Sequence, residues 1–220
     1  MHKIKYIPEK YIRKKSTDFV IWHDENMGKG EIKILENAVL SAFKYISLLK
    51  LIKHKRILNF CIYSNLTEGC KILQRDILAN MLMAPYTDEI NSLIILFPPS
   101  ISCVTPENLT RHLIHEIAHC FIDEKTGSKK ELEDNDKDMR IESWKSEGLA
   151  EVISYYALGR EKELEQKKFS DLSDKLLNEN LNDLNSKVRG KAFEIATAKV
   201  FLEIQKFGLN KYFDSMSKNC

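Results

Sequence analysis

The stretch LTRHLIHEIAHCFID, residues 109–123, decides the fold of the second half of this 220-residue chain. Thr105-Pro106-Glu107 stands just before it and combines a hydroxyl N-cap, a proline at the first helical position and an acid in the first turn. Such a combination is typical of a helix start. Apolar residues then recur at helical spacing, which predicts a helix with one face toward the core. They are Leu109, Leu113, Ile114, Ile117, Ala118 and Phe121.

Upstream of this helix, short apolar segments predict a small mixed sheet. A strand, a helix and a second strand open the chain, and two more strands follow before Pro98-Pro99 ends the sheet. The expected strands are Asp18–His23, Arg56–Ser64, MLMAP (81–85) and SLIILF (92–97), with a helix over Glu31–Ile52.

Downstream the pattern is helical. The charged stretch Asp123–Arg140 predicts an exposed loop, after which a periodic segment runs from Ser143 to Leu158 and stops at Gly159. A further helix is expected over Val188–Lys206. We therefore expect one α+β domain, with its sheet-containing part at about 15–100 and its helical part at about 105–220.

Composition argues against several classes of function. A net charge of +2 gives no strong field for nucleic acid, and the basic clusters Lys10–Lys15 and Lys50–Arg56 are short enough to be solvated surface. No apolar run approaches the roughly 20 residues of a membrane span. The five cysteines show no CxxC spacing, which argues against a thiolate zinc site. With no apolar segment behind the charged N-terminus, we expect a cytoplasmic protein that binds neither nucleic acid nor membranes.

The central helix carries the motif HEIAH. His115 and His119 are about one helical turn apart, so both rings can reach one tetrahedral Zn²⁺ from the same face. Glu116 would lie beside the ion, where it can act as a general base toward water that zinc has acidified. The alternative is a helix whose polar face happens to carry two histidines.

The segment WKSEGLAEVIS in the next predicted helix supplies acids one turn apart. Glu147 is a suitable third ligand, because a catalytic zinc takes three protein ligands and keeps one open position. Glu151 would face the same way and accept the free N–H of one ligand histidine. Gly148 makes this helix narrow, which predicts a close approach to the HEIAH helix. Taken alone, the two acids would indicate an ordinary exposed face.

HEIAH followed by W-x-x-E-G-x-A-E resembles the gluzincin metallopeptidases, and the chain is also similar to small bacterial gluzincin-like domains. The resemblance covers about residues 90–216, and its specific motifs lie within 112–156. It implies a zincin-like catalytic region with one zinc ion, with His115, His119 and Glu147 as ligands, and with a peptide or protein as substrate. In that family the last strand before the active helix binds an extended peptide by β-augmentation. The matching residues here are Ser92, Leu93, Ile94 and Ile95.

The family usually supplies a later histidine or tyrosine that stabilises the oxyanion, and no histidine follows His119. Tyr156 and Tyr212 are therefore named as catalytic candidates beside Tyr155, although a helical tyrosine is often a packing residue. The sequence thus leaves two main hypotheses. One is a zinc-dependent peptidase, and the other is a degenerate peptidase domain with a binding or regulatory role. A nucleic-acid-associated protein is a third, weaker hypothesis.

Overall fold

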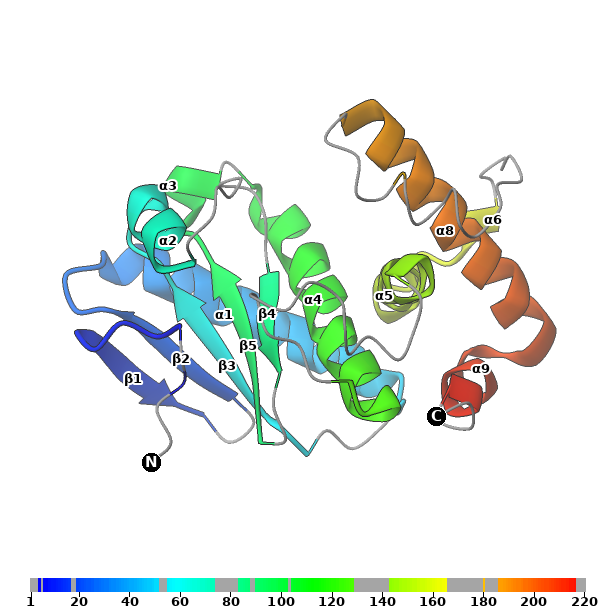
Figure 1. Cartoon of the computed structure of the whole chain (residues 1–220), viewed down its shortest axis with the longest axis horizontal. Helices are drawn as coiled ribbons and strands as arrows, with labels where there is room; N and C mark the ends of the chain where they lie inside the picture. The colour runs from blue at the N-terminus through cyan, green and yellow to red at the C-terminus, as the bar shows by residue number, and fades with distance from the viewer. Residues whose placement is uncertain are drawn as a thin grey trace.

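The structure is a computed structural model of the whole chain, and two regions make it up: a sheet with helices on it, and a helical region beside them (Figure 1). The residues that the structure describes are 4, 6–16, 19–51, 55–73, 83–87, 90–102, 104–128, 143–165, 180 and 186–216.

The described strands form one five-stranded mixed sheet in the order β1-β2-β3-β5-β4. β2, β3 and β5 run parallel, and the outer strands β1 and β4 are antiparallel to their neighbours. An α+β fold with a mixed sheet near the N-terminus is therefore confirmed. The bounds are β1 Tyr11–Lys15, β2 Phe19–Asp24, β3 Ile57–Ile62, β4 Met83–Thr87 and β5 Asn91–Leu96.

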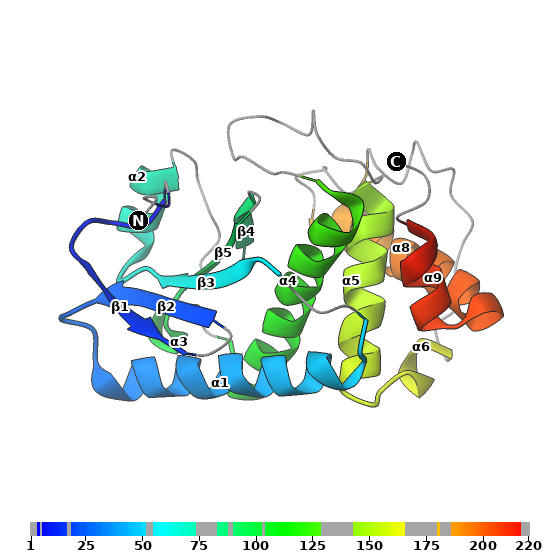
Figure 2. The ribbon, with the colours of Figure 1, turned by 90° about the horizontal axis from the view of Figure 1, so that it is seen from below.

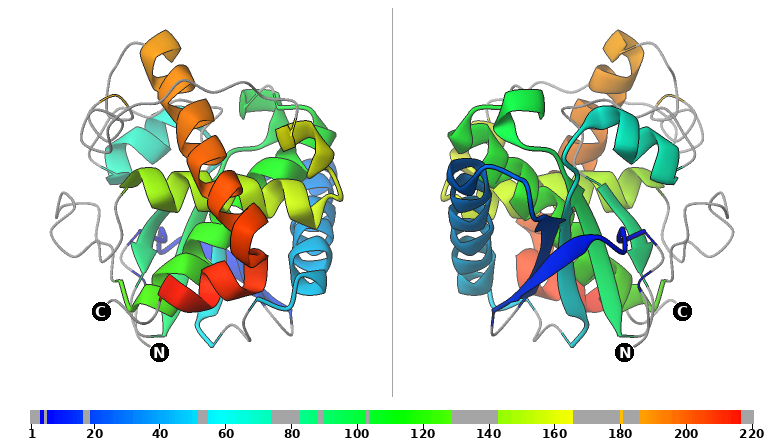
Figure 3. Two further views of the ribbon diagram at one scale, coloured as in Figure 1. Left: turned by 90° about the vertical axis from the view of Figure 1, so that its right-hand side faces the viewer. Right: turned by 90° about the vertical axis from the view of Figure 1, so that its left-hand side faces the viewer.

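The long helices cover one face of the sheet and continue beyond it, while the short helices α2 and α3 pack against the smaller cluster on the other face. α1 and α4 pack on the sheet, and α5 lies beside α4 on the side away from the strands (Figure 2). α8 and α9 form the outermost layer beyond α5 (Figure 3). The helices are α1 Lys29–Leu48, α2 Leu66–Leu73, α3 Pro99–Ser102, α4 Pro106–Thr126, α5 Ser143–Ala157, α6 Lys162–Glu165, α8 Ser186–Phe207 and α9 Leu209–Ser215.

Alternating side chains of the central strands divide between two cores. On β3, Leu58, Phe60 and Ile62 face the helices, while Cys61 faces a smaller cluster on the other side of the sheet. Successive residues of a strand point to opposite faces, so a strand buried on both sides is apolar almost throughout. α4 belongs to the larger core, which holds it firmly against the sheet.

α4 begins and ends at well-formed caps. The Thr105 side chain accepts a hydrogen bond from the Asn108 backbone N–H at 3.4 Å, and Gly127 ends the helix with a φ of 74°, as a left-handed cap requires. The expected helix start is confirmed. The loop expected from Asp123 onward is wrong for residues 123–126, where the helix continues to Thr126.

Polar side chains at this end of α4 are buried because they have partners. Asp123 accepts a hydrogen bond from the Thr87 hydroxyl at 3.3 Å, and the hydroxyls of Thr126 and Ser128 lie 2.8 Å apart. Residues 129–140 of the expected loop lie outside the described residues. Polarity in the sequence therefore indicated exposure at positions where hydrogen bonding allows burial.

Gly148 brings α5 close to α8. A Cβ on Gly148 would lie 2.5 Å from the backbone oxygen of Ala196 and 2.9 Å from the Val200 side chain, both on α8. We expect from the sequence that this glycine allows a close approach to α4, and that is wrong, because the close approach is to α8. The narrow face of α5 meets α8, and the face with Glu147 and Glu151 meets α4.

The remaining helices follow the sequence pattern closely. α5 ends at Ala157, with Gly159 at a φ of 66°, and α8 ends before Gly208 at a φ of 81°. α1 is shorter than expected, since it ends at Leu48, and Lys50 takes a φ of 51°. None of the described helices is both long enough and apolar enough to cross a membrane.

Candidate metal centre

α4 and α5 bring the ligand candidates together at their mutual contact. The apolar stripe of α4 is buried in the core, which turns the neighbouring face, with His115 and His119, toward α5. Glu147 comes from α5 and faces α4 across this contact. Two separate helices thus present three metal-binding side chains to one point.

Three donor atoms form an almost equilateral triangle. The Nε2 atoms of His115 and His119 are 3.1 Å apart, and each lies 3.3 Å from Oε2 of Glu147. Among the described residues this is the group of histidine, cysteine or acidic side chains whose ligand atoms converge closely enough to hold one ion.

The triangle has the size that a tetrahedral ion demands. With bonds of about 2.0–2.1 Å, ligand atoms of tetrahedral zinc are about 3.3–3.4 Å apart. Hydrogen bonds cannot join all three pairs of atoms at once. With one Nε2 protonated, the other Nε2 and the carboxylate oxygen face each other with lone pairs, and with both protonated, two N–H groups face each other. A cation at the centre satisfies all three donors, so the residues present fit a zinc ion.

Outer hydrogen bonds hold both imidazoles in the orientation that a ligand needs. Nδ1 of His115 is 3.2 Å from Oε2 of Glu151, and Nδ1 of His119 is 3.0 Å from the Ser146 hydroxyl. When each Nδ1 carries the hydrogen, each Nε2 directs its lone pair toward the shared point. Glu151 therefore occupies the place expected for it.

Sequence reasoning missed Ser146, Arg111 and Phe193. Ser146 directly precedes Glu147, and Arg111 lies four residues before His115, so helical spacing could have indicated both. Arg111 Nη1 donates to Oε1 of Glu151 at 2.5 Å. The ring of Phe193, on α8, lies 5.6 Å from that of His115 with planes 31° apart, and nothing in the sequence marks this contact.

Two carboxylates, those of Glu147 and Glu151, surround His115. Burial opposes protonation of His115, but its hydrogen bonds to Glu147 and Glu151 outweigh burial and raise the pKa of His115 to about 10. Burial likewise opposes ionisation of the two carboxyl groups, yet the neighbouring histidines lower the pKa of Glu147 and that of Glu151. Two carboxylates at one point, with a histidine drawn into the charged form, make a site that attracts a cation.

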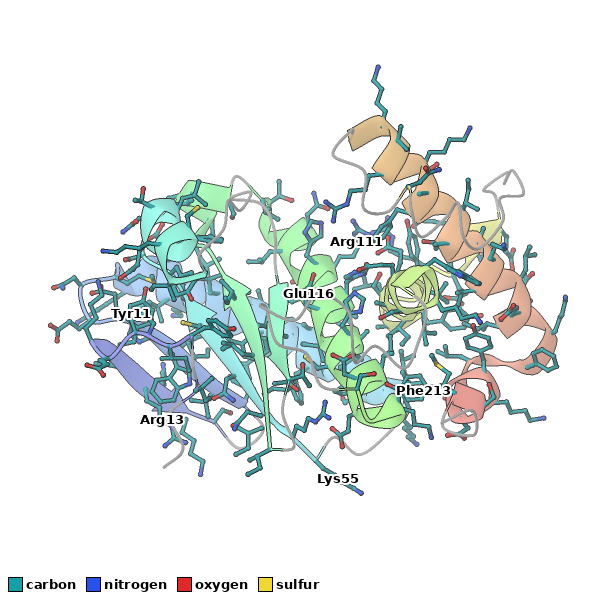
Figure 4. The ribbon with its side chains drawn as sticks, viewed as in Figure 1. Tyr11, Arg13, Lys55, Arg111, Glu116 and Phe213 are labelled. Carbon is teal, nitrogen blue, oxygen red and sulfur yellow. The ribbon has the colours of Figure 1, made fainter. Side chains whose placement is uncertain are left out.

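Glu116 lies beside the triangle and contributes no atom to it. It is partly exposed on α4, immediately after His115, and its charge is among those that raise the pKa of His115 (Figure 4). His112 lies one turn before His115, and burial together with Arg111 lowers the pKa of His112. A carboxylate next to the ligands but not among them has the position of a proton acceptor.

No family model and no curated protein matches this chain. The resemblance to gluzincins therefore rests on the motif residues themselves, and the geometry of the centre has to carry the functional argument.

The structure does not bring Tyr156 or Tyr212 to this centre. Tyr156 follows Glu147 by nine residues, which is about 180° around α5 and about 13.5 Å along it, and its ring faces Phe201 of α8 at 6.5 Å. Tyr212 is buried in the larger core on α9. Burial comes first among the causes that raise its pKa, followed by Glu203. Neither tyrosine contacts the ligand residues, so the expectation that they stabilise an oxyanion is wrong for the structure as it stands.

Peptide binding along β5 is also ruled out by the sheet order. β5 pairs with β3 on one side and with β4 on the other, so it has no free edge. The residues expected to bind substrate are moreover completely buried, namely Ser92, Leu93, Ile94 and Ile95. The strand beside α4 at the edge of the described sheet is β4, which a local sequence pattern could not distinguish from β5.

Proposed function

We propose that this chain is a zinc-dependent peptidase of the gluzincin type, with His115, His119 and Glu147 as ligands and Glu116 as general base. One observation carries the proposal: the triangle of 3.1, 3.3 and 3.3 Å that three donor atoms form between two helices. Hydrogen bonds that the outer ring nitrogens donate to Glu151 and Ser146 support it, since metal-ligating histidines nearly always have such partners.

The chain's own residues would share the work of peptide-bond hydrolysis. A zinc ion, when bound, supplies Lewis acidity that polarises a carbonyl group and acidifies water. Glu116 would take a proton from the attacking water and pass it to the leaving amine. An extended substrate would lie along β4, whose outer edge has no partner strand among the described residues. A peptide or protein substrate and a cytoplasmic location remain parts of this proposal.

Metal analysis with a Glu116→Gln variant tests the proposal. We expect one zinc ion per chain in both forms, because Gln at this position leaves the three ligands intact. We expect hydrolysis of a mixed peptide library to fall by about 10²–10⁴-fold in the variant, the usual contribution of a general base. Glu194→Gln, an exposed acid on α8, is the matched control and should leave both properties unchanged.

A catalytically degenerate peptidase domain with a binding or regulatory role is the second candidate. It is favoured by the positions of Tyr156, whose ring lies against Phe201, and of Tyr212, which is buried in the larger core. Stoichiometric zinc with no hydrolysis by the parent chain would select this candidate. A chain that takes up no zinc at all would contradict the peptidase and leave the second candidate, which does not require the ion.

The nucleic-acid hypothesis gains nothing from the basic N-terminal segment. Lys10 pairs with Asp24 and Glu68, and Lys14 pairs with Glu36, so carboxylates of the same chain balance these charges. Steep salt dependence of binding to DNA or RNA would be needed to revive it.

A further inference from the structure

Behind the ligand His115, a line of contacts leads outward to Arg111. The two oxygens of Glu151 are used separately: Oε2 meets Nδ1 of His115 at 3.2 Å, and Oε1 accepts from Nη1 of Arg111 at 2.5 Å. The carboxylate is thus held at both ends. Its orientation toward His115 depends on what holds the far oxygen.

Arg111 is itself fixed by a second contact. Its Nη2 lies 3.5 Å from Nε2 of His112, the next residue along α4, so the guanidinium is held on two sides. The side chain of Arg111 is 27% exposed and that of Glu151 only 11%, which separates this pair from an ordinary solvent-exposed ion pair. A charge-assisted bond of this kind is short and strongly directional.

Helical geometry explains why the arginine lies here. Arg111, His115 and His119 are four residues apart in turn, and therefore lie on one face of α4. Glu151 stands opposite them one turn after Glu147 on α5. The same contact between α4 and α5 that assembles the ligands therefore also assembles the pair behind them. Figure 4 labels Arg111 beside this contact.

We propose that Arg111 is a positioning residue of the metal centre: it clamps Oε1 of Glu151 so that Oε2 holds the His115 ring with Nε2 toward the ion. This inference rests on the proposed function, since it concerns the same metal site. Without Arg111 the Glu151 carboxylate is free to turn toward solvent, and His115 loses its fixed orientation. Outer partners of ligand histidines typically change metal affinity about 10–100-fold.

Zinc affinity of the full chain, measured in competition with a chromophoric chelator, tests the proposal. We expect Arg111→Gln to weaken zinc binding about tenfold, Glu151→Gln to weaken it to a similar extent, and the double variant to be no weaker than Glu151→Gln alone. Arg111→Lys, which keeps a donor and a charge, should recover part of the loss. Arg160→Gln breaks an exposed arginine–glutamate pair with Glu163, away from the centre, and should change nothing.

The visible spectrum of the Co²⁺-loaded protein gives a readout that a merely structural role would not move. We expect Arg111→Gln to alter the cobalt absorption bands while far-ultraviolet circular dichroism stays unchanged. Unaltered zinc affinity and cobalt bands in Arg111→Gln would overturn the inference, as would losses that multiply in the double variant. If Arg111→Gln does not fold, Arg111→Lys takes its place in the comparison. The inference would then be overturned if the double variant Arg111→Lys/Glu151→Gln kept the zinc affinity and the cobalt bands of the parent chain. A parent chain that binds no zinc overturns the proposed function instead, so the two failures are distinguishable.

Discussion

Two charged clusters of this molecule look alike in composition and differ in what stands at their centre. Near the N-terminus, Lys10 places its ammonium 3.1 Å from Asp24 and 2.7 Å from Glu68. Tyr11 and Ser64 donate to the same Glu68 carboxylate at 2.8 and 2.7 Å. Between α4 and α5, by contrast, two imidazoles and a carboxylate meet with no ammonium or guanidinium among them.

The difference separates a structural cluster from a candidate binding site. In the Lys10 cluster, meaning Lys10, Tyr11, Asp24, Ser64 and Glu68, the chain supplies the cation and the donors itself. In the metal centre the guanidinium of Arg111 is used on Glu151 and stays outside the triangle, so that within the triangle of the metal-free chain the positive charge is a proton held by His115. Convergence of charged groups is therefore informative when the counter-charge is an exchangeable proton, which a metal ion can replace, and not the fixed charge of a lysine or arginine.

Removing a ligand should have the largest effect on zinc affinity. If it did not, the distinction between the metal centre and the Lys10 cluster would fail. We expect Glu147→Ala to weaken zinc binding by well over the hundredfold that loss of an outer partner can cause, because one of three ligands is gone. Lys10→Met should leave zinc affinity unchanged. Competition with a chelator measures both, and equal effects of the two changes would show that the centre is not the site of binding.

Crowding α5 against α8 should have the next largest effect. A methyl group on Gly148 meets the Ala196 carbonyl oxygen at 2.5 Å, so Gly148→Ala must displace α5, and overpacking of this kind costs about 1–3 kcal/mol. Because α5 carries Glu147, zinc affinity should fall as well. Denaturant unfolding and metal competition measure the two effects.

Gly190→Ala on α8 is the matched control for Gly148→Ala. A Cβ at Gly190 meets nothing within 4 Å, and alanine is the better helix former, so this change should stabilise the chain by up to about 1 kcal/mol. If Gly148→Ala were equally well tolerated, the close contact between α5 and α8 could not be what positions the ligand helix.

Metal-free chain should reveal the histidine of the centre by its pH dependence. The folded pKa of His115 is about 10 against an ordinary 6.5, so the stability it contributes is fully present below pH 6.5 and is lost as pH rises toward 10. With chelator present, the difference in unfolding free energy between the parent and His115→Gln should therefore shrink from pH 6 to pH 10. A difference that grew over this range would mean that the two carboxylates do not charge His115.

The residues proposed for the metal centre could be picked out from spacing within single helices, whereas the residues packed around them could not. His115, His119 and Glu116 depend on spacing within α4, and Glu147 and Glu151 on spacing within α5, so local periodicity suffices to propose them. The same arithmetic could have excluded Tyr156, which lies half a turn away from Glu147 around α5. That step was available from sequence alone.

What the sequence could not indicate depends on contacts between distant elements. Whether β5 lies inside the sheet or at its edge depends on where β4 pairs, and both segments read as apolar strands. Gly148 signalled a close contact but not its partner, because α4 and α8 flank α5 on two sides. The ring of Phe193 beside His115 is likewise a matter of tertiary packing.

The Lys10 cluster should respond to acid with the opposite sign and the smallest effect. Burial raises the pKa of Glu68, but bonds from Lys10, Ser64 and Tyr11 outweigh it and leave the pKa below 4.5. Its stabilisation is therefore present above about pH 4.5 and is lost as pH falls further. Glu68→Gln should destabilise the chain by at most about 1 kcal/mol at pH 7, because its charged partner Lys10 is largely exposed. Denaturant unfolding of the parent and the variant at pH 7 and pH 3 measures this difference in stability, which should vanish at pH 3. Zinc affinity of the variant at pH 7 should equal that of the parent. A loss of zinc affinity would mean that the two clusters are coupled through the sheet.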